Sequence, residues 1–198
     1  MSKIRTAVIL CGGRGTRLGN LGKKLPKTLV KIQGKEILWY ILKILKKNNF
    51  NHIIIPTGYK GNLIKKFIKK NKIIFKNIDL IKTGEDTNIG MRISMIKNKI
   101  KSDNFLLLNG DAIFSFDLNK IFLNHQKKDK DLTFISGEIT YPYGTVGVKN
   151  NEVIDFNRNL IYEALRVRSE KDKYLAYNYT GMSIINTEKL IKNNRIFA

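Results

Sequence analysis

The sequence has only one cysteine, two histidines and 16 acidic residues. A single cysteine cannot form a disulfide within the chain, which agrees with a reducing, cytoplasmic location. No apolar run approaches the roughly 20 residues that cross a bilayer. The N-terminus also lacks the apolar core and small-residue cleavage site of a signal peptide. We therefore expect a cytoplasmic chain with no membrane partner.

Side chains for covalent catalysis are also scarce. Neither a Ser/His/Asp nor a Cys/His pattern occurs, so a nucleophile activated by histidine is not indicated. His52 and His125 have no partner nearby in the sequence, and we interpret both as structural or surface residues rather than ligands. Cys11 ends an apolar run, and nothing marks it as activated, so buried packing is its expected role.

Negative charge is scarce relative to positive charge, since 37 Lys and Arg face 16 Asp and Glu, a net charge of +21. One interpretation is nucleic-acid binding. The other is a bias towards lysine, asparagine and isoleucine along the whole chain. A nucleic-acid face is more often clustered and interleaved with aromatic residues, whereas lysine pairs such as Lys46-Lys47 and Lys127-Lys128 are scattered. We favour the bias, with no specific nucleic-acid partner, and expect the resulting field to attract anionic substrates.

The 198 residues predict one domain with a substantial core. Strand and helix patterns alternate up to about residue 130, which indicates a parallel α/β sheet with its ligand at the carboxyl ends of the strands. After residue 131 short strands with short connections predict a smaller, more antiparallel layer. The expected strands are 7–11, 52–56, 72–75, 79–82, 105–108, 132–135, 144–148, 152–155 and 177–185. The expected helices are 36–48, 63–68, 88–96 capped by Thr87 or Asn88, 117–128 capped by Asp117, and a short one at 190–191.

A glycine-rich turn follows the first buried strand. Gly12, Gly13 and Gly15 can adopt φ > 0 and turn backbone N–H groups towards one concavity, which suits phosphate oxygens. Arg17 and Lys27 add cations nearby. This pattern predicts a triphosphate site, although a glycine-rich turn with scattered surface cations is the alternative. The dinucleotide fingerprint and the Walker A pattern both fail in this stretch.

Two other strands also end in glycine, at Gly58 and Gly110, which supports one shared crevice. Asp111 comes directly after Gly110, where a carboxylate would be a hard oxygen ligand for Mg²⁺. The alternative is that Asp111 caps the next turn.

The stretch Gly12-Gly-Arg-Gly-Thr-Arg-Leu18, followed by Pro26-Lys27, resembles the signature of the sugar-phosphate nucleotidyltransferases. The resemblance implies an α/β, Rossmann-like fold of the nucleotide-diphospho-sugar transferase type, in which a mostly parallel sheet is flanked by helices. It implies a Mg²⁺-dependent enzyme with Lys27 at the α-phosphate and Arg17 over the β/γ phosphates as catalytic residues, and Asp111 as the metal ligand. Within a single domain, 1–198, residues 1–130 would bind the nucleotide and residues 131–198 the acceptor.

Three further stretches, Lys35–Tyr40, Gly58–Gly61 and Gly84–Arg92, resemble the glucose-1-phosphate cytidylyltransferase branch of that family. This similarity implies CTP as donor, with Arg92 reaching towards the nucleotide or the acceptor phosphate. If this resemblance is set aside, the sequence pattern alone predicts that Arg92 is a surface residue early in a helix. The nucleotide-binding residues expected from the resemblance are Leu10, Cys11, Gly12, Gly13, Gly15, Thr16, Arg17, Lys27, Gly58, Tyr59, Lys60, Gly84, Arg92 and Asp111.

The acceptor is less well indicated. Tyr143-Gly144 matches the family, but no Glu-Lys-Pro follows it, so either Arg158 substitutes for the lysine or the acceptor is not a sugar. Tyr179 would narrow the acceptor pocket. The profile is also similar to a cytidylyltransferase of capsule phosphoramidate biosynthesis, so L-glutamine phosphate or a sugar 1-phosphate is expected, in capsule precursor synthesis. The expected acceptor-binding residues are Tyr143, Gly144, Arg158, Tyr179 and Gly181.

Family members run some tens of residues further and carry a second Mg²⁺-binding aspartate there. We therefore expect a C-terminal truncation with reduced activity, unless another carboxylate or a partner chain serves instead. The alternatives left open are GTP or UTP as donor with a sugar 1-phosphate, a relative that binds CTP without turnover, and a basic nucleic-acid-binding protein. Oligomeric state also stays open, with a homo-oligomer among the alternatives, because no surface stripe identifies an interface.

Overall fold

The structure, a computed structural model, describes residues 5–15, 18–140, 143–162, 164–168 and 173–192. The chain divides into two compact units, one formed by Met1–Thr133 with Gly181–Ala198 and the other by Phe134–Thr180. We call these unit 1 and unit 2. None of the described helices is long and apolar enough to cross a membrane.

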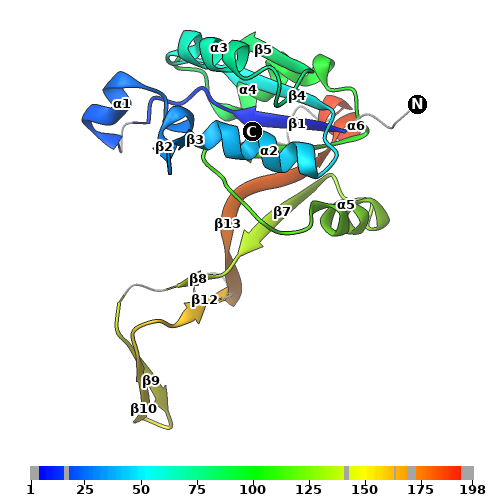
Figure 1. Cartoon of the computed structure of the whole chain (residues 1–198). Coiled ribbons are helices and arrows are strands. Elements are labelled where there is room, and N and C mark those ends of the chain that lie inside the picture. The colour runs from blue at the N-terminus through cyan, green and yellow to red at the C-terminus, as the bar shows by residue number, and fades with distance from the viewer. Residues whose placement is uncertain (1–4, 16–17, 141–142, 163, 169–172, 193–198) are drawn as a thin grey trace. The chain divides into compact units, whose positions relative to one another are not determined.

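Unit 1 is built on a mostly parallel sheet with strand order β13-β6-β1-β4-β5. β1 lies between β4 and β6 and runs parallel to both, with Ala7 opposite Ile53 and Leu106 (Figure 1). These three residues are fully buried, as the continuous apolar runs predict for strands covered on both faces. The predicted α/β class, with a mostly parallel sheet flanked by helices, is confirmed.

The predicted elements that form in unit 1 lie close to their expected bounds, whereas α1, β2, β3 and the two 3-10 turns were not predicted. The strands are β1 Thr6–Leu10, β2 Lys31–Ile32, β3 Lys35–Glu36, β4 His52–Thr57, β5 Ile78–Lys82 and β6 Asn104–Asn109. The α-helices are α1 Asn20–Lys24, α2 Ile37–Lys47, α3 Gly61–Lys70, α4 Ile89–Ile96, α5 Leu118–Lys127 and α6 Thr187–Lys192, and two 3-10 turns span Lys27–Leu29 and Lys97–Lys99.

Two helices begin at the predicted caps. The Asn88 side chain accepts a hydrogen bond from the Met91 N–H at 2.8 Å, and Asp117 accepts one from the Asn119 N–H at 2.8 Å. Each cap satisfies a backbone donor that the first helical turn leaves free. α4 then packs its apolar side chains into the core. That core contains Val8, Ile54, Ile93, Ile96, Ile100, Phe105, Leu107, Ile185 and Leu190.

The predicted strand at residues 72–75 is wrong. These residues form turns after α3, closed by a hydrogen bond from the Ile74 N–H to the Asn71 carbonyl at 2.9 Å. Ile74 and Phe75 are buried, whereas Ile73 is 90% exposed. Ile74 and Phe75 therefore anchor a turn against the core, and their apolar side chains gave the sequence a short apolar run that is not a strand.

Unit 2 consists of antiparallel strand pairs, as the short strands and short connections after residue 131 predict. β9 pairs with β10, β8 with β11, and β12 with the first part of β13, all antiparallel. β13 continues into unit 1, where Met182–Asn186 pair antiparallel with β6. The sequence analysis placed residues 182–186 in the acceptor-binding part of the chain, residues 131–198. The strands are β7 Leu132–Gly137, β8 Ile139–Thr140, β9 Thr145–Lys149, β10 Glu152–Asn157, β11 Ile161–Tyr162, β12 Ala164–Arg168 and β13 Lys173–Asn186.

Candidate functional site

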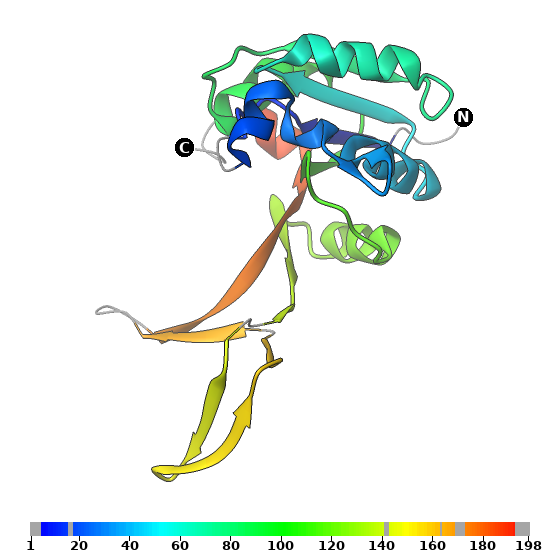
Figure 2. The same ribbon diagram turned by 60° about the vertical axis from the view of Figure 1, so that its left-hand side comes forward.

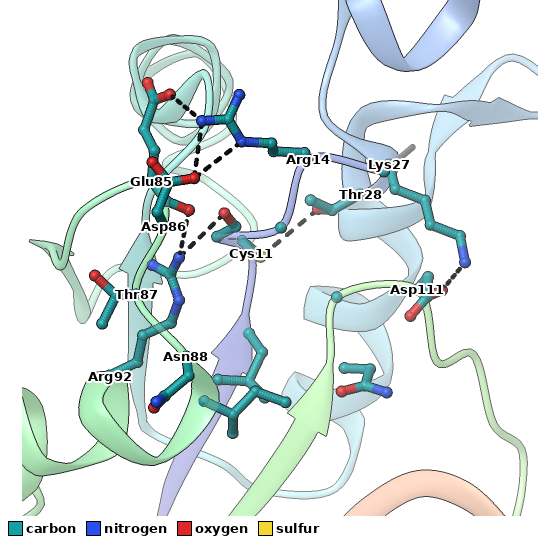
Figure 3. Close-up of a pocket in the computed structure, with 17 residues that line it drawn as sticks. Cys11, Arg14, Lys27, Thr28, Glu85, Asp86, Thr87, Asn88, Arg92 and Asp111 are labelled. Carbon is teal, nitrogen blue, oxygen red and sulfur yellow. Dashed lines mark hydrogen bonds and ion pairs between the residues drawn. The ribbon is translucent and has the colours of Figure 1, made fainter. Parts of the chain in front are cut away.

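A cavity of about 420 Å³ lies in unit 1, at the carboxyl ends of β1 and β6 (Figure 3). This is the place where the strand pattern predicts a ligand site. Its lining comes from the turn after β1, the start of the Lys27–Leu29 turn, the segment before α4 and the end of β6. The lining residues are Leu10, Cys11, Gly12, Gly13, Arg14, Gly15, Lys27, Thr28, Glu85, Asp86, Thr87, Asn88, Ile89, Arg92, Asn109, Gly110 and Asp111.

Two glycines of the turn after β1 are explained by their surroundings. A Cβ atom on Gly12 would lie 2.3 Å from the guanidinium carbon of Arg92, so any other residue there would displace that guanidinium. Gly15 has φ +61°, a left-handed conformation that favours glycine. Gly13 has open space around its Cα. The turn therefore presents bare backbone to the cavity, as expected of a phosphate-binding turn.

Arg92 is buried, with 4% of its surface exposed. Its guanidinium donates hydrogen bonds to the Thr83 hydroxyl at 2.6 Å, the Glu85 carbonyl at 3.2 Å and the Gly12 carbonyl at 3.3 Å. Burial lowers the pKa of Arg92 from its ordinary value, and the Asp86 carboxylate opposes that shift. The interpretation of Arg92 as a surface residue, made without the family, is wrong. Its side chain ties the glycine turn to the segment that begins after β5.

Lys27 and Asp111 point towards each other and form an ion pair (Figure 3). Lys27 opens the 3-10 turn after Pro26, and Asp111 follows the end of β6. Their side chains are 50% and 30% exposed, so both remain accessible from the cavity. The predicted pair of a phosphate-binding cation and a metal-binding carboxylate is thus brought together from positions 84 residues apart.

Gly110 fixes where Asp111 stands. Its N–H donates to the Leu10 carbonyl at 3.0 Å, which ties the end of β6 to the end of β1. A Cβ atom at Gly110 would lie 2.8 Å from that same carbonyl oxygen and 3.0 Å from the Cys11 sulfur. The close approach of the two strand ends therefore requires glycine at this position.

The residues present fit a magnesium ion that is shared with a substrate. Among the described residues, no group of three or more His, Cys, Asp or Glu side chains is placed to hold a metal ion. Mg²⁺ commonly binds through one or two protein carboxylates together with substrate phosphates. Asp111 supplies one accessible carboxylate beside the glycine turn, so the donor set suits a metal bound together with a phosphate, and not an all-protein cage.

Arg14 is a cavity residue that sequence reasoning missed. It donates two hydrogen bonds to Asp86, at 2.8 and 3.1 Å, and lies 3.7 Å from Glu85 (Figure 3). The hydrogen bond to Asp86 raises the pKa of Arg14. Arg14 occupies the variable position of the signature, so the sequence carried no signal for it. The other lining residues without an expected binding role are Thr28, Glu85, Asp86, Thr87, Asn88, Ile89, Asn109 and Gly110. Those from Glu85 to Ile89 lie within the Gly84–Arg92 stretch quoted for the resemblance.

Four expected nucleotide-binding residues do not line this cavity. A Cβ atom on Gly58 would lie 2.3 Å from the Gly84 carbonyl oxygen, so Gly58 packs against the loop that carries Gly84. The Lys60 ammonium donates hydrogen bonds to the backbone carbonyls of Lys23 and Lys24. The binding roles of Gly58, Tyr59, Lys60 and Gly84 stay predictions. Thr16 and Arg17 lie outside the described residues.

Cys11 behaves as a packing residue. It is 3% exposed, and its thiol donates to the Thr28 hydroxyl at 3.7 Å. Burial raises the pKa of Cys11 to about 12, so the reactive thiolate is almost absent near neutral pH.

Four expected acceptor-binding residues lie in unit 2. The Phe156 ring covers Gly144, and the Arg158 guanidinium lies 5.9 Å from the centre of that ring. The Tyr179 ring meets Phe134 edge to face, and Tyr143 is exposed. The fifth residue, Gly181, lies in unit 1 with φ +80°. Their roles stay predictions.

The chain is similar to known proteins over most of its length. It is 32% identical over 171 residues to a "Probable glucose-1-phosphate cytidylyltransferase" of Bacillus subtilis, a match that covers 76% of this chain and 67% of that protein. It is 33% identical over 152 residues to a "D-glycero-alpha-D-manno-heptose 1-phosphate guanylyltransferase" of Aneurinibacillus thermoaerophilus, with coverage of 76% and 66%. The chain therefore spans about two thirds of the length of these curated relatives.

A solved structure shows the same fold. The crystal structure of HddC from Yersinia pseudotuberculosis matches with a TM-score of 0.69 and 22% identity, over 96% of this chain and 80% of that chain. Residues 6–157 also match the family described as "Nucleotidyl transferase". Since that match covers more than half of the sequence and includes the cavity that holds Lys27 and Asp111, this chain belongs to the nucleotidyl transferase family.

Proposed function

We propose that this chain transfers a nucleotidyl group from a nucleoside triphosphate to a phosphorylated acceptor and releases pyrophosphate. The observation that carries the proposal is one cavity that brings the Gly12–Gly15 backbone, Lys27 and Asp111 together. In this reaction an acceptor phosphate oxygen attacks the α-phosphorus, the bond to the β-phosphate oxygen breaks, and pyrophosphate leaves. Both reactants are anionic, so catalysis depends on positioning and charge neutralisation.

Each side chain then has a task that its geometry allows. The backbone of the glycine turn would hold the triphosphate, and the Lys27 ammonium would neutralise charge on the α-phosphate. Asp111 would hold Mg²⁺, which when bound neutralises phosphate oxygens. No general base is needed, because a phosphate monoester is largely ionised near neutral pH. The ion pair between Lys27 and Asp111 would separate as each gains its new partner.

We further propose CTP as donor and a sugar 1-phosphate or L-glutamine phosphate as acceptor, in capsule precursor synthesis. The name of the Bacillus subtilis relative supports CTP, and the name of the Aneurinibacillus thermoaerophilus relative makes GTP the alternative. No Glu-Lys-Pro follows Tyr143-Gly144, so either Arg158 would substitute for the lysine or the acceptor is not a sugar, and both acceptor classes stay in the proposal.

The test is pyrophosphate release with CTP, GTP, UTP and dTTP, each combined with Mg²⁺ and a panel of phosphorylated acceptors, with mass detection of the nucleoside diphosphate product. Lys27→Ala should lower turnover by about 100-fold or more, as the loss of one charge-stabilising group does in other enzymes. Lys31→Ala is the matched control, because Lys31 is an exposed lysine on the neighbouring β2, and its turnover should be unchanged.

The outcomes test separately the donor nucleotide, the catalytic role of Lys27 and transferase activity itself. A CDP product supports the cytidylyl assignment, and a GDP product moves the donor to GTP. Equal rates for Lys27→Ala and wild type refute the catalytic assignment. Nucleotide binding without product from any acceptor refutes transferase activity for this chain.

A further inference from the structure

Two arginine side chains, those of Arg14 and Arg92, join the same two segments of unit 1. One segment is the Gly12–Gly15 turn after β1, and the other, residues 83–88, follows β5. β4, the cyan strand in Figure 2, lies between β1 and β5 in the sheet, so a connection between the two segments crosses the end of β4. The two arginines differ in burial and in the kind of acceptor that each one meets.

Arg92 forms the fixed connection. It is buried, and its three acceptors among the described residues are neutral, namely one hydroxyl and two backbone carbonyls. A Cβ atom on Gly58, just after β4, would lie 2.9 Å from a terminal nitrogen of Arg92, so this side chain runs close to the backbone there. Moving it away would leave buried acceptors without a donor, which is costly. We therefore expect Arg92 to keep its partners when a ligand binds.

Arg14 has the opposite environment. Its side chain is 50% exposed, and its partners are the carboxylates of Asp86, at 2.8 Å, and Glu85, at 3.7 Å. The side chains of these two acidic residues are 80% and 53% exposed, so water can replace Arg14 at either one. Exposed ion pairs contribute little to stability, so a change of partner costs little. The guanidinium carbon of Arg14 also lies 5.7 Å from the centre of the Tyr59 ring, just after β4.

The three charged residues of this ion pair all line the cavity of the candidate site. Arg14 extends from the glycine turn towards Asp86 and Glu85 on the opposite wall (Figure 3). The backbone of that turn is the part of the cavity that would hold a triphosphate. A phosphate group binds a guanidinium through two parallel hydrogen bonds, which match its planar fork. Nucleotide phosphates in the cavity would therefore be strong competitors for Arg14.

We propose that Arg14 exchanges its ion pair with Asp86 and Glu85 for the phosphates of the donor nucleotide. In the free chain the two carboxylates hold the guanidinium against the opposite wall of the cavity. When a nucleoside triphosphate binds, the guanidinium leaves them and binds phosphate oxygens. The carboxylates thus compete with the nucleotide for Arg14 and weaken its binding. This inference rests on the proposed function, because it requires nucleotide phosphates in the cavity, and it assigns a role to a position that the family signature leaves variable.

Isothermal titration calorimetry with CTP, GTP, UTP and dTTP, with Mg²⁺ and without any acceptor, tests the exchange apart from turnover. The triphosphate that wild type binds most tightly then serves for the variants. Arg14→Gln removes the charge and the fork, so affinity should fall about tenfold, as the loss of a hydrogen bond to a charged group predicts. Asp86→Asn should raise affinity about two- to fivefold, because it releases Arg14 from an exposed ion pair. A merely structural ion pair would make both variants bind more weakly.

The control for the loss of negative charge is Asp86→Asn made in the Arg14→Gln background. If the gain in affinity comes from the release of Arg14, Asp86→Asn should give no gain there. The control for the loss of positive charge is Lys31→Gln, at an exposed lysine of β2, which should bind like wild type. Urea unfolding should give midpoints close to wild type for all variants, because the substituted side chains are exposed.

The outcomes distinguish this inference from the proposed function. Unchanged binding by Arg14→Gln, weaker binding by Asp86→Asn, or an equal gain from Asp86→Asn without Arg14 would each overturn the exchange, while triphosphate binding by wild type would leave the proposed function standing. If wild type binds none of the four triphosphates, the proposed function fails and the exchange fails with it.

Discussion

Replacing Arg92 by methionine should loosen the Gly12–Gly15 turn and destabilise unit 1. Methionine has a similar length and stays apolar where Arg92 is buried. It cannot donate, so three acceptors lose their partner: the Thr83 hydroxyl and the carbonyls of Gly12 and Glu85. Two of these acceptors belong to the segment after β5 and one to the turn after β1.

The magnitude follows from the hydrogen bonds that are lost. A hydrogen bond to a charged group contributes about 1.5–3 kcal/mol, and a buried acceptor left without a donor adds a desolvation cost. The three bonds share one side chain and are not additive, so we expect a loss of about 3–5 kcal/mol in unfolding free energy, the range for breaking a buried polar cluster. Arg92→Lys keeps the charge but lacks the planar fork that reaches three acceptors, and should lose about half as much.

Urea unfolding of wild type, Arg92→Met and Arg92→Lys measures this loss, and pyrophosphate release measures the KM for the nucleotide. KM should rise in both variants, because the Gly12 carbonyl is no longer held in place. Lys99→Met is the control, since Lys99 is exposed just after the same helix and should change stability by less than about 0.5 kcal/mol. If Arg92→Met is as mild as this control, the structural role assigned to Arg92 is wrong.

Two further predictions concern the core that supports the site. Gly110→Ala places a Cβ atom 2.8 Å from the Leu10 carbonyl oxygen, so thermal unfolding should show a loss of about 1–3 kcal/mol and pyrophosphate release should fall as Asp111 moves. Gly13→Ala, with nothing within 4 Å of the added atom, should change stability little, and a similar loss in both variants would contradict the packing argument. Burial and the nearby Lys189 lower the pKa of His125 from its ordinary 6.5, so stability should be full above pH 6.5 and fall as the pH drops below it, because the unfolded chain then binds a proton that the folded chain does not. Urea midpoints measured between neutral and mildly acidic pH check this, and His125→Asn should flatten the dependence.

The parts of the fold that the sequence predicts well are those set by local chemistry. Strands buried on both faces require unbroken apolar runs, so β1, β4 and β6 are visible as such runs. Helix starts need a side-chain acceptor, which identifies Asn88 and Asp117. The turn at residues 72–75 was mistaken for a strand because an apolar anchor in a turn and one in a strand have the same composition.

In the site, too, residues that belong to a local sequence pattern were predicted, whereas residues defined by partners far away in the sequence were not. Gly12 and Lys27 were expected because they belong to a spaced motif, and Asp111 because it directly follows a glycine at the end of an apolar strand. The burial of Arg92 was not predicted, because its partners include Gly12, 80 residues away along the chain. Arg14 was missed for the same reason, since its ion pair with Asp86 joins positions 72 residues apart. Partners at such separations depend on the folded topology and leave no local pattern.

The unequal division of charge bears on the proposed function. Unit 1 carries the whole net charge of +21, whereas unit 2 is neutral. The cavity therefore lies in the strongly basic part of the chain, and under the proposed function its positive field would attract both a triphosphate and a phosphorylated acceptor. The lysine-rich composition carries no motif of its own, yet it would raise the local concentration of both anionic substrates.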